Sequence, residues 1–70
     1  MKIYIVRHYD AGRDTSHRRM FVERRNAWAA YIETITRFGF EPDEADPGFD
    51  LEFDLDFGSI VEIYEQETED

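Results

Sequence analysis

The sequence predicts a small α+β domain in which one helix packs on one face of a small antiparallel sheet. Acidic and apolar residues alternate over residues 50–57, which is typical of a strand with one buried face. Apolar residues recur at helical spacing from Trp28 to Phe38, and a β-branched and aromatic run occupies residues 3–6. From these segments we expect the order ββαββ, with βαββ as the fallback.

The length and composition of the chain limit what it can be. Seventy residues allow a single domain, which we place over residues 1–70, because a chain of this size buries only about 60% of its unfolded surface. The lack of cysteine excludes disulfides and thiolate metal sites, and it fits a reducing cytoplasm. The longest apolar run, residues 27–32, is far shorter than the roughly 20 residues of a membrane span, and no export signal is recognised. We therefore expect a soluble cytoplasmic protein with no membrane contact.

The N-terminal part of the chain is expected to form a hairpin. Residues 3–6 predict a strand covered on both faces, and residues 10–16 have the composition and length of a hairpin loop. Residues 17–22 fit either a second strand, with the helix beginning near Glu23, or the first turns of a longer helix capped within residues 14–16. We favour the strand because a lone N-terminal strand would leave a long unpaired edge.

The helix is predicted from the spacing of its apolar residues and from the residues that end it. Gly39 is expected in the left-handed conformation that closes a helix, with Phe40 packing back on the last turn. The apolar positions recur at intervals of three and four residues and are Trp28, Tyr31, Ile32, Ile35 and Phe38.

The alternating segment predicts a strand over residues 50–57, with its two faces of opposite character. The residues expected to face the helix are Leu51, Phe53, Leu55 and Phe57. The residues expected to face solvent are Asp50, Glu52, Asp54 and Asp56.

A hairpin is expected to connect this strand with a last strand that begins near Ile60. A two-residue turn at Gly58 would place Val61 and Ile63 opposite the acidic residues. A three-residue loop pairs Phe57 with Val61 and keeps one face of the hairpin apolar, so we favour the longer loop.

Arg7 and His8 directly follow the first expected strand. Their order resembles the Arg-His-Gly-Glu motif of histidine phosphatases, in which the His accepts a phosphoryl group and the Arg holds the phosphate. Tyr9 stands where that family has Gly, so its side chain would crowd the phosphate. His17 lies too close in sequence to match the family's second catalytic His. We therefore expect no phosphatase activity.

The acidic strand does not predict a calcium site. A calcium-binding loop that began at Glu52 would need Gly at its sixth position and Glu at its twelfth, and these positions hold Phe57 and Ile63. Ser16 and Ser59 have no His and acid partners that the spacing predicts, and no glycine-rich phosphate loop is present. We expect no enzyme, no metal site and no cofactor.

Charge is divided unevenly between the two halves of the chain. Residues 1–40 hold all eight basic residues and four carboxylates, a net charge of +4, whereas residues 41–70 hold thirteen carboxylates and no basic residue. The basic residues include a cluster with His17, which could bind a protein partner: Arg18, Arg19, Arg24 and Arg25. Direct binding of nucleic acid is not expected from a chain whose net charge is −9.

The acidic residues of the last strands form the predicted partner site. Along one face of a strand they recur at about 6.6 to 6.8 Å, so they can imitate the phosphates of a nucleic acid, although a solvated outer face would have the same pattern. The predicted site comprises Asp50, Glu52, Asp54 and Asp56, with Glu62 on the neighbouring strand and Asp43, Glu44 and Asp46 in the preceding loop.

The chain also resembles small acidic phage and prophage proteins, including anti-CRISPR proteins that act as nucleic-acid mimics. The matching residues precede an acidic hairpin and are Phe21, Arg24, Ala27, Tyr31 and Ile32, while Glu23 stands where that pattern has Ser or Thr. The resemblance implies a phage-encoded, non-enzymatic inhibitor that occupies a basic nucleic-acid-binding surface of a host defence complex. The alternative is a regulatory or assembly adapter that binds a protein through its arginine cluster or associates with itself as a homodimer.

Overall fold

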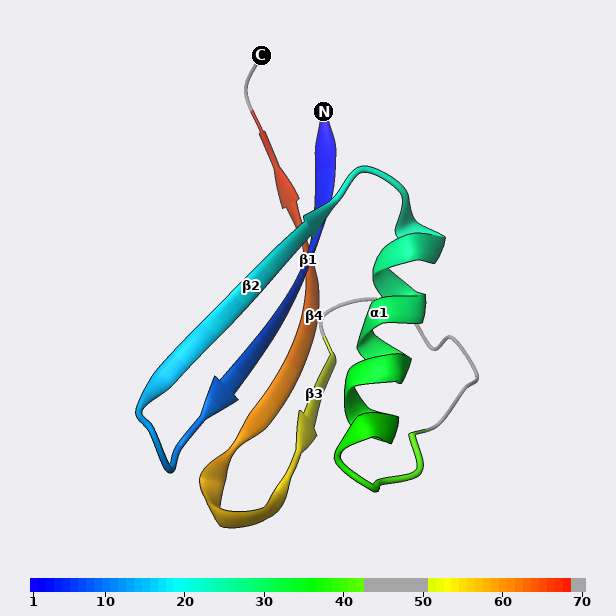
Figure 1. Cartoon of the computed structure of the whole chain (residues 1–70). Coiled ribbons are helices and arrows are strands. Elements are labelled where there is room, and N and C mark those ends of the chain that lie inside the picture. The colour runs from blue at the N-terminus through cyan, green and yellow to red at the C-terminus, as the bar shows by residue number, and fades with distance from the viewer. Residues whose placement is uncertain (43–50, 69–70) are drawn as a thin grey trace.

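The chain folds as two hairpins joined by one helix, as Figure 1 shows for the computed structural model, which describes residues 1–42 and 51–68. The predicted α+β class and the order ββαββ are confirmed. The elements are β1 (Lys2–Asp10), β2 (Thr15–Phe21), α1 (Arg24–Arg37), β3 (Leu51–Asp54), the short 3-10 turn η1 (Asp56–Gly58) and β4 (Ile60–Glu67).

The four strands form one antiparallel sheet in the order β2-β1-β4-β3. The first and last strands of the chain therefore lie side by side at the centre, paired from Lys2 opposite Glu67 to Tyr9 opposite Ile60. The strands β2 and β3 form the two edges, and α1 packs on one face of the sheet, mainly against the central strands β1 and β4. Residues 17–22 thus belong mainly to a strand, as favoured above, and Glu23 is the residue before the helix.

The core lies between α1 and one face of the sheet. Ile35, Val61 and Ile63 are fully buried there, and burial of each such side chain contributes about 1.5 to 3 kcal/mol. The predicted packing of the helix on the last hairpin is confirmed for the partly buried residues that surround this core, namely Trp28, Ile32, Leu51, Phe53 and Leu55.

The helix ends as its sequence predicts. Gly39 has a φ of 87°, its N–H donates to the carbonyl of Thr36, and the N–H of Phe40 donates to the carbonyl of Ile35. These two hydrogen bonds form a Schellman motif, in which orphan carbonyls of the last turn are satisfied and the chain reverses. In the described part of the chain, no helix is long and apolar enough to cross a membrane.

The predicted extent of the third strand is wrong. The strand β3 stops at Asp54, and Phe53 rather than Phe57 lies opposite Val61. The connection to β4 is a longer loop over residues 55–59, which the N–H of Leu55 closes by donating to the carbonyl of Ser59. Phe57, expected in the core, has a φ of 62° and is 96% exposed.

The helix end generates a prediction about stability. Gly39→Ala should destabilise the fold by about 1 to 2 kcal/mol, because nothing crowds the new Cβ but the left-handed backbone disfavours an L side chain. Gly12→Ala is the matched control, since a Cβ there meets only ordinary contact with Asp10 and no left-handed φ is required. Urea unfolding of both variants measures the difference. Equal stability of the two would contradict the assigned role of Gly39.

Candidate functional site

The face of the sheet turned away from α1 is the larger candidate surface, which we call the open face. Its residues alternate along each strand with those that pack beneath the helix, and none of the described helices or strands covers it. The open face comprises Ile3, Ile5, Arg7 and Tyr9 of β1; Ser16, Arg18 and Met20 of β2; Ile60, Glu62, Tyr64 and Gln66 of β4; and Glu52 and Asp54 of β3.

The centre of the open face is apolar. Ile5 is only 2% exposed although no helix covers it, and its register partners are Met20 on β2 and Tyr64 on β4. Met20 itself is 71% exposed. Burial on both faces of β1 is thus confirmed for Ile5 and Val6, which point to opposite faces and are 2% and 4% exposed, although α1 covers only the face of Val6. Met20 is the exposed apolar side chain beside Ile5, and exposed apolar surface makes the open face a candidate binding surface.

A row of four charged residues crosses the open face from one edge to the other. The register places Arg18 opposite Arg7, Arg7 opposite Glu62, and Glu62 opposite Glu52. Arg7 donates from its Nε to Oε1 of Glu62, and its Nη2 lies against the same oxygen. The row is thus basic at β2 and acidic at β3, with one ion pair at its centre.

The observed order of charges in this row is less stable than an alternating order would be. Like charges that lie directly opposite each other on neighbouring strands destabilise a sheet, and the row contains two such pairs, Arg18 with Arg7 and Glu62 with Glu52. An alternating order would contain none. The row therefore retains a separation of charge that the fold itself does not require.

The predicted acidic residues are only partly brought together. Glu52 and Asp54 lie exposed on the open face of β3, with no ion pair recorded for either among the described residues, whereas Glu62 is paired with Arg7. Asp56 belongs to η1, so it does not continue the strand, and its side chain lies outside the description. The remaining predicted site residues lie outside the described residues: Asp43, Glu44, Asp46 and Asp50.

The basic cluster does not form one patch. Arg18 lies on the open face, whereas the guanidinium of Arg19 lies on the helix side, 5.1 Å from the centre of the Phe21 ring. Arg25 stands at the start of α1, where its Nε lies 3.3 Å from Oε2 of Glu23. The sequence neighbours are thus separated by the pleat of β2 and by the turn into the helix.

Tyr9 joins the open face to the first hairpin loop. Its hydroxyl donates to Oδ1 of Asp14 at 2.8 Å, and this hydrogen bond with the nearby carboxylate raises the pKa of Tyr9 above its ordinary value. Burial raises the pKa of Tyr31 in the core in the same direction. The surroundings of both phenols therefore favour their neutral form.

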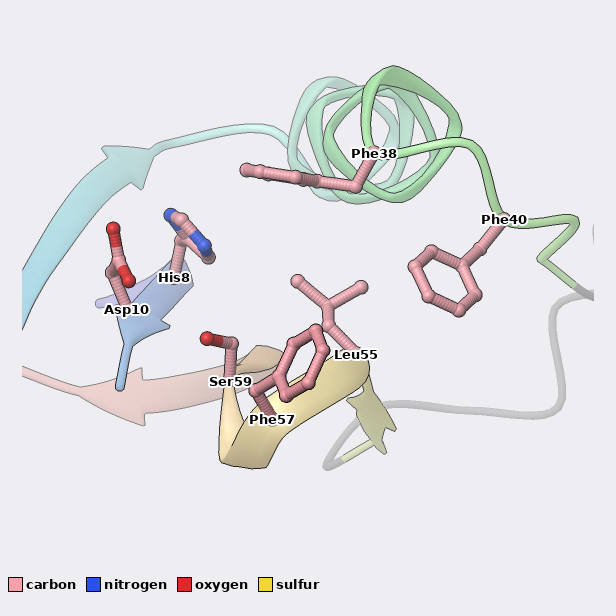
Figure 2. Close-up of a pocket in the computed structure, with 7 residues that line it drawn as sticks. All are labelled: His8, Asp10, Phe38, Phe40, Leu55, Phe57 and Ser59. Carbon is pink, nitrogen blue, oxygen red and sulfur yellow. The ribbon is translucent and has the colours of Figure 1, made fainter. Parts of the chain in front are cut away.

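A second candidate site lies where both hairpin loops and the end of α1 meet, as Figure 2 shows, and we call it the aromatic pocket. It is a hollow of about 220 Å³. His8 and Asp10 come from β1, while Phe38 and Phe40 come from the end of the helix. The loop between β3 and β4 supplies Leu55, Phe57 and Ser59.

Contacts between the lining residues and their neighbours hold the walls of the aromatic pocket in place. The His8 and Phe38 rings lie 4.8 Å apart, and the Phe40 ring meets Phe53 edge-on at 5.8 Å. Ser59 accepts a hydrogen bond from the N–H of Ala11 at 3.0 Å, which ties the two hairpin loops together. The pocket is therefore built from segments far apart in the sequence.

The sequence does not predict the aromatic pocket, because its patterns indicate other roles for two of the lining residues. Alternation predicts Phe57 in the core, and the Arg-His order at Arg7 and His8 resembles only a phosphatase motif. The one signal that could have indicated it is Gly58, since Gly favours a turn and so allows the strand to end before Phe57.

Comparison of the chain with protein-family models, with curated proteins and with solved structures finds no match. Among the described residues, no group of three or more His, Asp or Glu side chains is placed to hold a metal ion. The open face and the aromatic pocket are therefore interpreted from their own geometry.

The central ion pair of the open face generates a stability prediction. A double-mutant cycle of Arg7→Met and Glu62→Met should give a coupling energy of about 1 kcal/mol, since both side chains are less than one-third exposed. The pair Arg37 and Glu33 on α1 is about two-thirds exposed, and the same substitutions there should couple by about 0.3 to 0.5 kcal/mol. Urea unfolding measures both cycles, and equal couplings would contradict the different environments of the pairs.

Proposed function

We propose that the chain is a non-enzymatic binding protein whose open face occupies a basic, nucleic-acid-binding surface of another protein. The observation that carries this proposal is the charged row, in which Glu52 on the edge strand β3 lies directly opposite Glu62 on β4 despite their repulsion. A positively charged partner would relieve that repulsion.

The spacing of the acidic edge supports this class of partner. Glu52 and Asp54 share one face of β3, so they recur at about 6.6 to 6.8 Å on a hydrogen-bonded strand. Carboxylates held at regular intervals on a rigid sheet can take the places of phosphates in a basic groove. The net charge of −9 attracts such a groove and repels nucleic acid itself.

The apolar centre of the open face supports a protein as the partner. A hollow of about 440 Å³ on this face is lined by both apolar and polar residues, Ile3, Ile5, Arg18, Met20 and Gln66. The contacts that Ile3 and Met20 can offer there are apolar and resist salt. Charge would then guide the encounter and orient the partner, while the apolar centre would supply affinity.

A protein that occupies a nucleic-acid-binding surface acts as an inhibitor of that surface. The resemblance to small phage proteins makes a host defence complex the class of target that we propose, with the site in the host cytoplasm. No chemical step is needed for such inhibition, so we propose no enzymatic role.

The proposal is tested by reversing charge at the acidic edge. Lysate that has been treated with nuclease is passed over the immobilised chain, and each captured protein is tested for binding of a labelled oligonucleotide. The wild-type chain should displace the oligonucleotide, and Glu52→Lys with Asp54→Lys should weaken this competition by at least tenfold, because two attractive contacts become repulsive. Fluorescence anisotropy measures the competition.

Two controls separate the site from the total charge. Glu33→Lys with Glu41→Lys makes the same change in net charge on exposed residues away from the open face, and competition should be nearly unchanged. Arg7→Gln frees Glu62 from its ion pair and should strengthen competition. Equal competition by the edge variant and the wild type would reject the proposal.

A second function, self-association, is favoured by the symmetry of the charged row. A two-fold axis parallel to the strands would place β2 of one copy over β3 of its partner, with Arg18 over Glu52 and Arg7 over Glu62. The apolar residues of the two open faces would then meet at the centre.

The residue Arg18 distinguishes the two functions. Arg18→Glu should abolish a homodimer in sedimentation experiments, and Glu52→Arg added to it should restore the dimer. The same Arg18→Glu variant should not weaken competition for the basic partner, because it removes a positive charge from the open face and adds a negative one.

A further inference from the structure

We propose that the aromatic pocket binds the alkylammonium end of a lysine side chain. Four rings, those of His8, Phe38, Phe40 and Phe57, stand around the pocket, with the Asp10 carboxylate and the Ser59 hydroxyl on one side and Phe40 on the other (Figure 2). Aromatic walls combined with a carboxylate are the chemistry that recognises an organic cation.

The size of the pocket fits this ligand. Its volume is about 220 Å³, and a butylammonium group needs roughly 150 Å³ if each heavy atom takes the volume of one water molecule in the liquid. The methylene groups of a lysine would pack on Leu55 and the phenyl rings, and the ammonium would approach Asp10.

The Asp10 carboxylate retains capacity for a cation. Its Oδ1 accepts from the N–H of Gly12 at 3.0 Å, and its Oδ2 lies 4.0 Å from Nε of Arg13. The Arg13 side chain is 83% exposed, so it compensates the carboxylate charge only weakly. An incoming ammonium would compete with Arg13 for the same oxygen.

Phe57 provides the second, independent observation. A bulky residue in the left-handed region is strained, and a ring that is 96% exposed gains nothing from burial, so the fold alone does not favour Phe at this position. Contact with a ligand would give the exposed ring a stabilising partner.

We infer that the lysine belongs to the same protein partner that binds the open face. His8 and Phe38 line the pocket on the helix side of the sheet, whereas Asp54 ends β3 on the open face. The loop that carries Phe57 follows Asp54, so a partner that contacts both sites would extend around this loop. That the lysine comes from a basic protein surface rests on the proposed function, whereas binding of an alkylammonium group by the pocket does not.

The experiment titrates the intact chain with n-butylammonium and, separately, with the neutral analogue 1-butanol. Butylammonium should shift the backbone amide signals of His8, Phe57 and Ser59 in NMR spectra, with a dissociation constant in the millimolar range, about that of a small ligand. Butanol should bind at least several-fold more weakly, because it lacks the charge. Equal shifts by both ligands, or shifts confined to other amides, would overturn the proposal.

Three variants and one control locate the site. Phe57→Asn keeps a residue that tolerates the left-handed backbone and should weaken binding by about two- to fivefold. Asp10→Asn should weaken it by about tenfold, and Arg13→Gln should strengthen it. Val22→Asn, which replaces another exposed apolar residue outside the pocket, should change nothing.

The two proposals fail in different ways. If butylammonium does not bind but the acidic-edge variant still loses competition, the lysine pocket is wrong and the proposed function stands. If butylammonium binds in the pocket but reversal of charge at Glu52 and Asp54 has no effect, the pocket stands and the proposed function is wrong.

Discussion

One helix of 14 residues can cover only one face of a four-stranded sheet, and the rest of this structure depends on that constraint. The two central strands, β1 and β4, are the first and last of the chain, and both carry apolar residues on their two faces. The helix covers Val6, Val61 and Ile63. The residues on the opposite side of these two strands belong to the open face.

Two features of the structure support the binding role that we propose. The open face keeps like charges adjacent across the sheet, and the aromatic pocket keeps a strained and exposed Phe57. Each arrangement opposes stability in the isolated chain. Because a small domain has a free energy of unfolding of only about 5 to 15 kcal/mol, we propose that contacts with a partner offset these unfavourable arrangements.

The fold was predictable where local chemistry decides the structure, and not where long-range pairing does. The end of α1 at Gly39 and the strand at residues 17–22 follow from turn and edge requirements in the sequence. The register of the last hairpin does not, because the predicted and observed pairings of Val61 differ by an even number of residues. An even shift keeps the same side chains on each face, so alternation cannot distinguish the two.

The same distinction between local chemistry and long-range pairing decides which parts of the candidate sites were predictable. That Glu52 and Asp54 share a face was predictable from their spacing, since the pleat alone sets it. The pairing of Arg7 with Glu62 was not, because it depends on the meeting of the first and last strands. The aromatic pocket was not predictable either, since its walls come from three segments that only the folded sheet brings together.

The most direct test of the open face as a binding surface is NMR cross-saturation from a captured basic protein to the methyl groups of the chain. If the open face binds the partner, signal is lost at Ile3, Met20 and Ile60, which lie on that face. Loss confined instead to Ala29 and Thr36, which are exposed on α1, would contradict it.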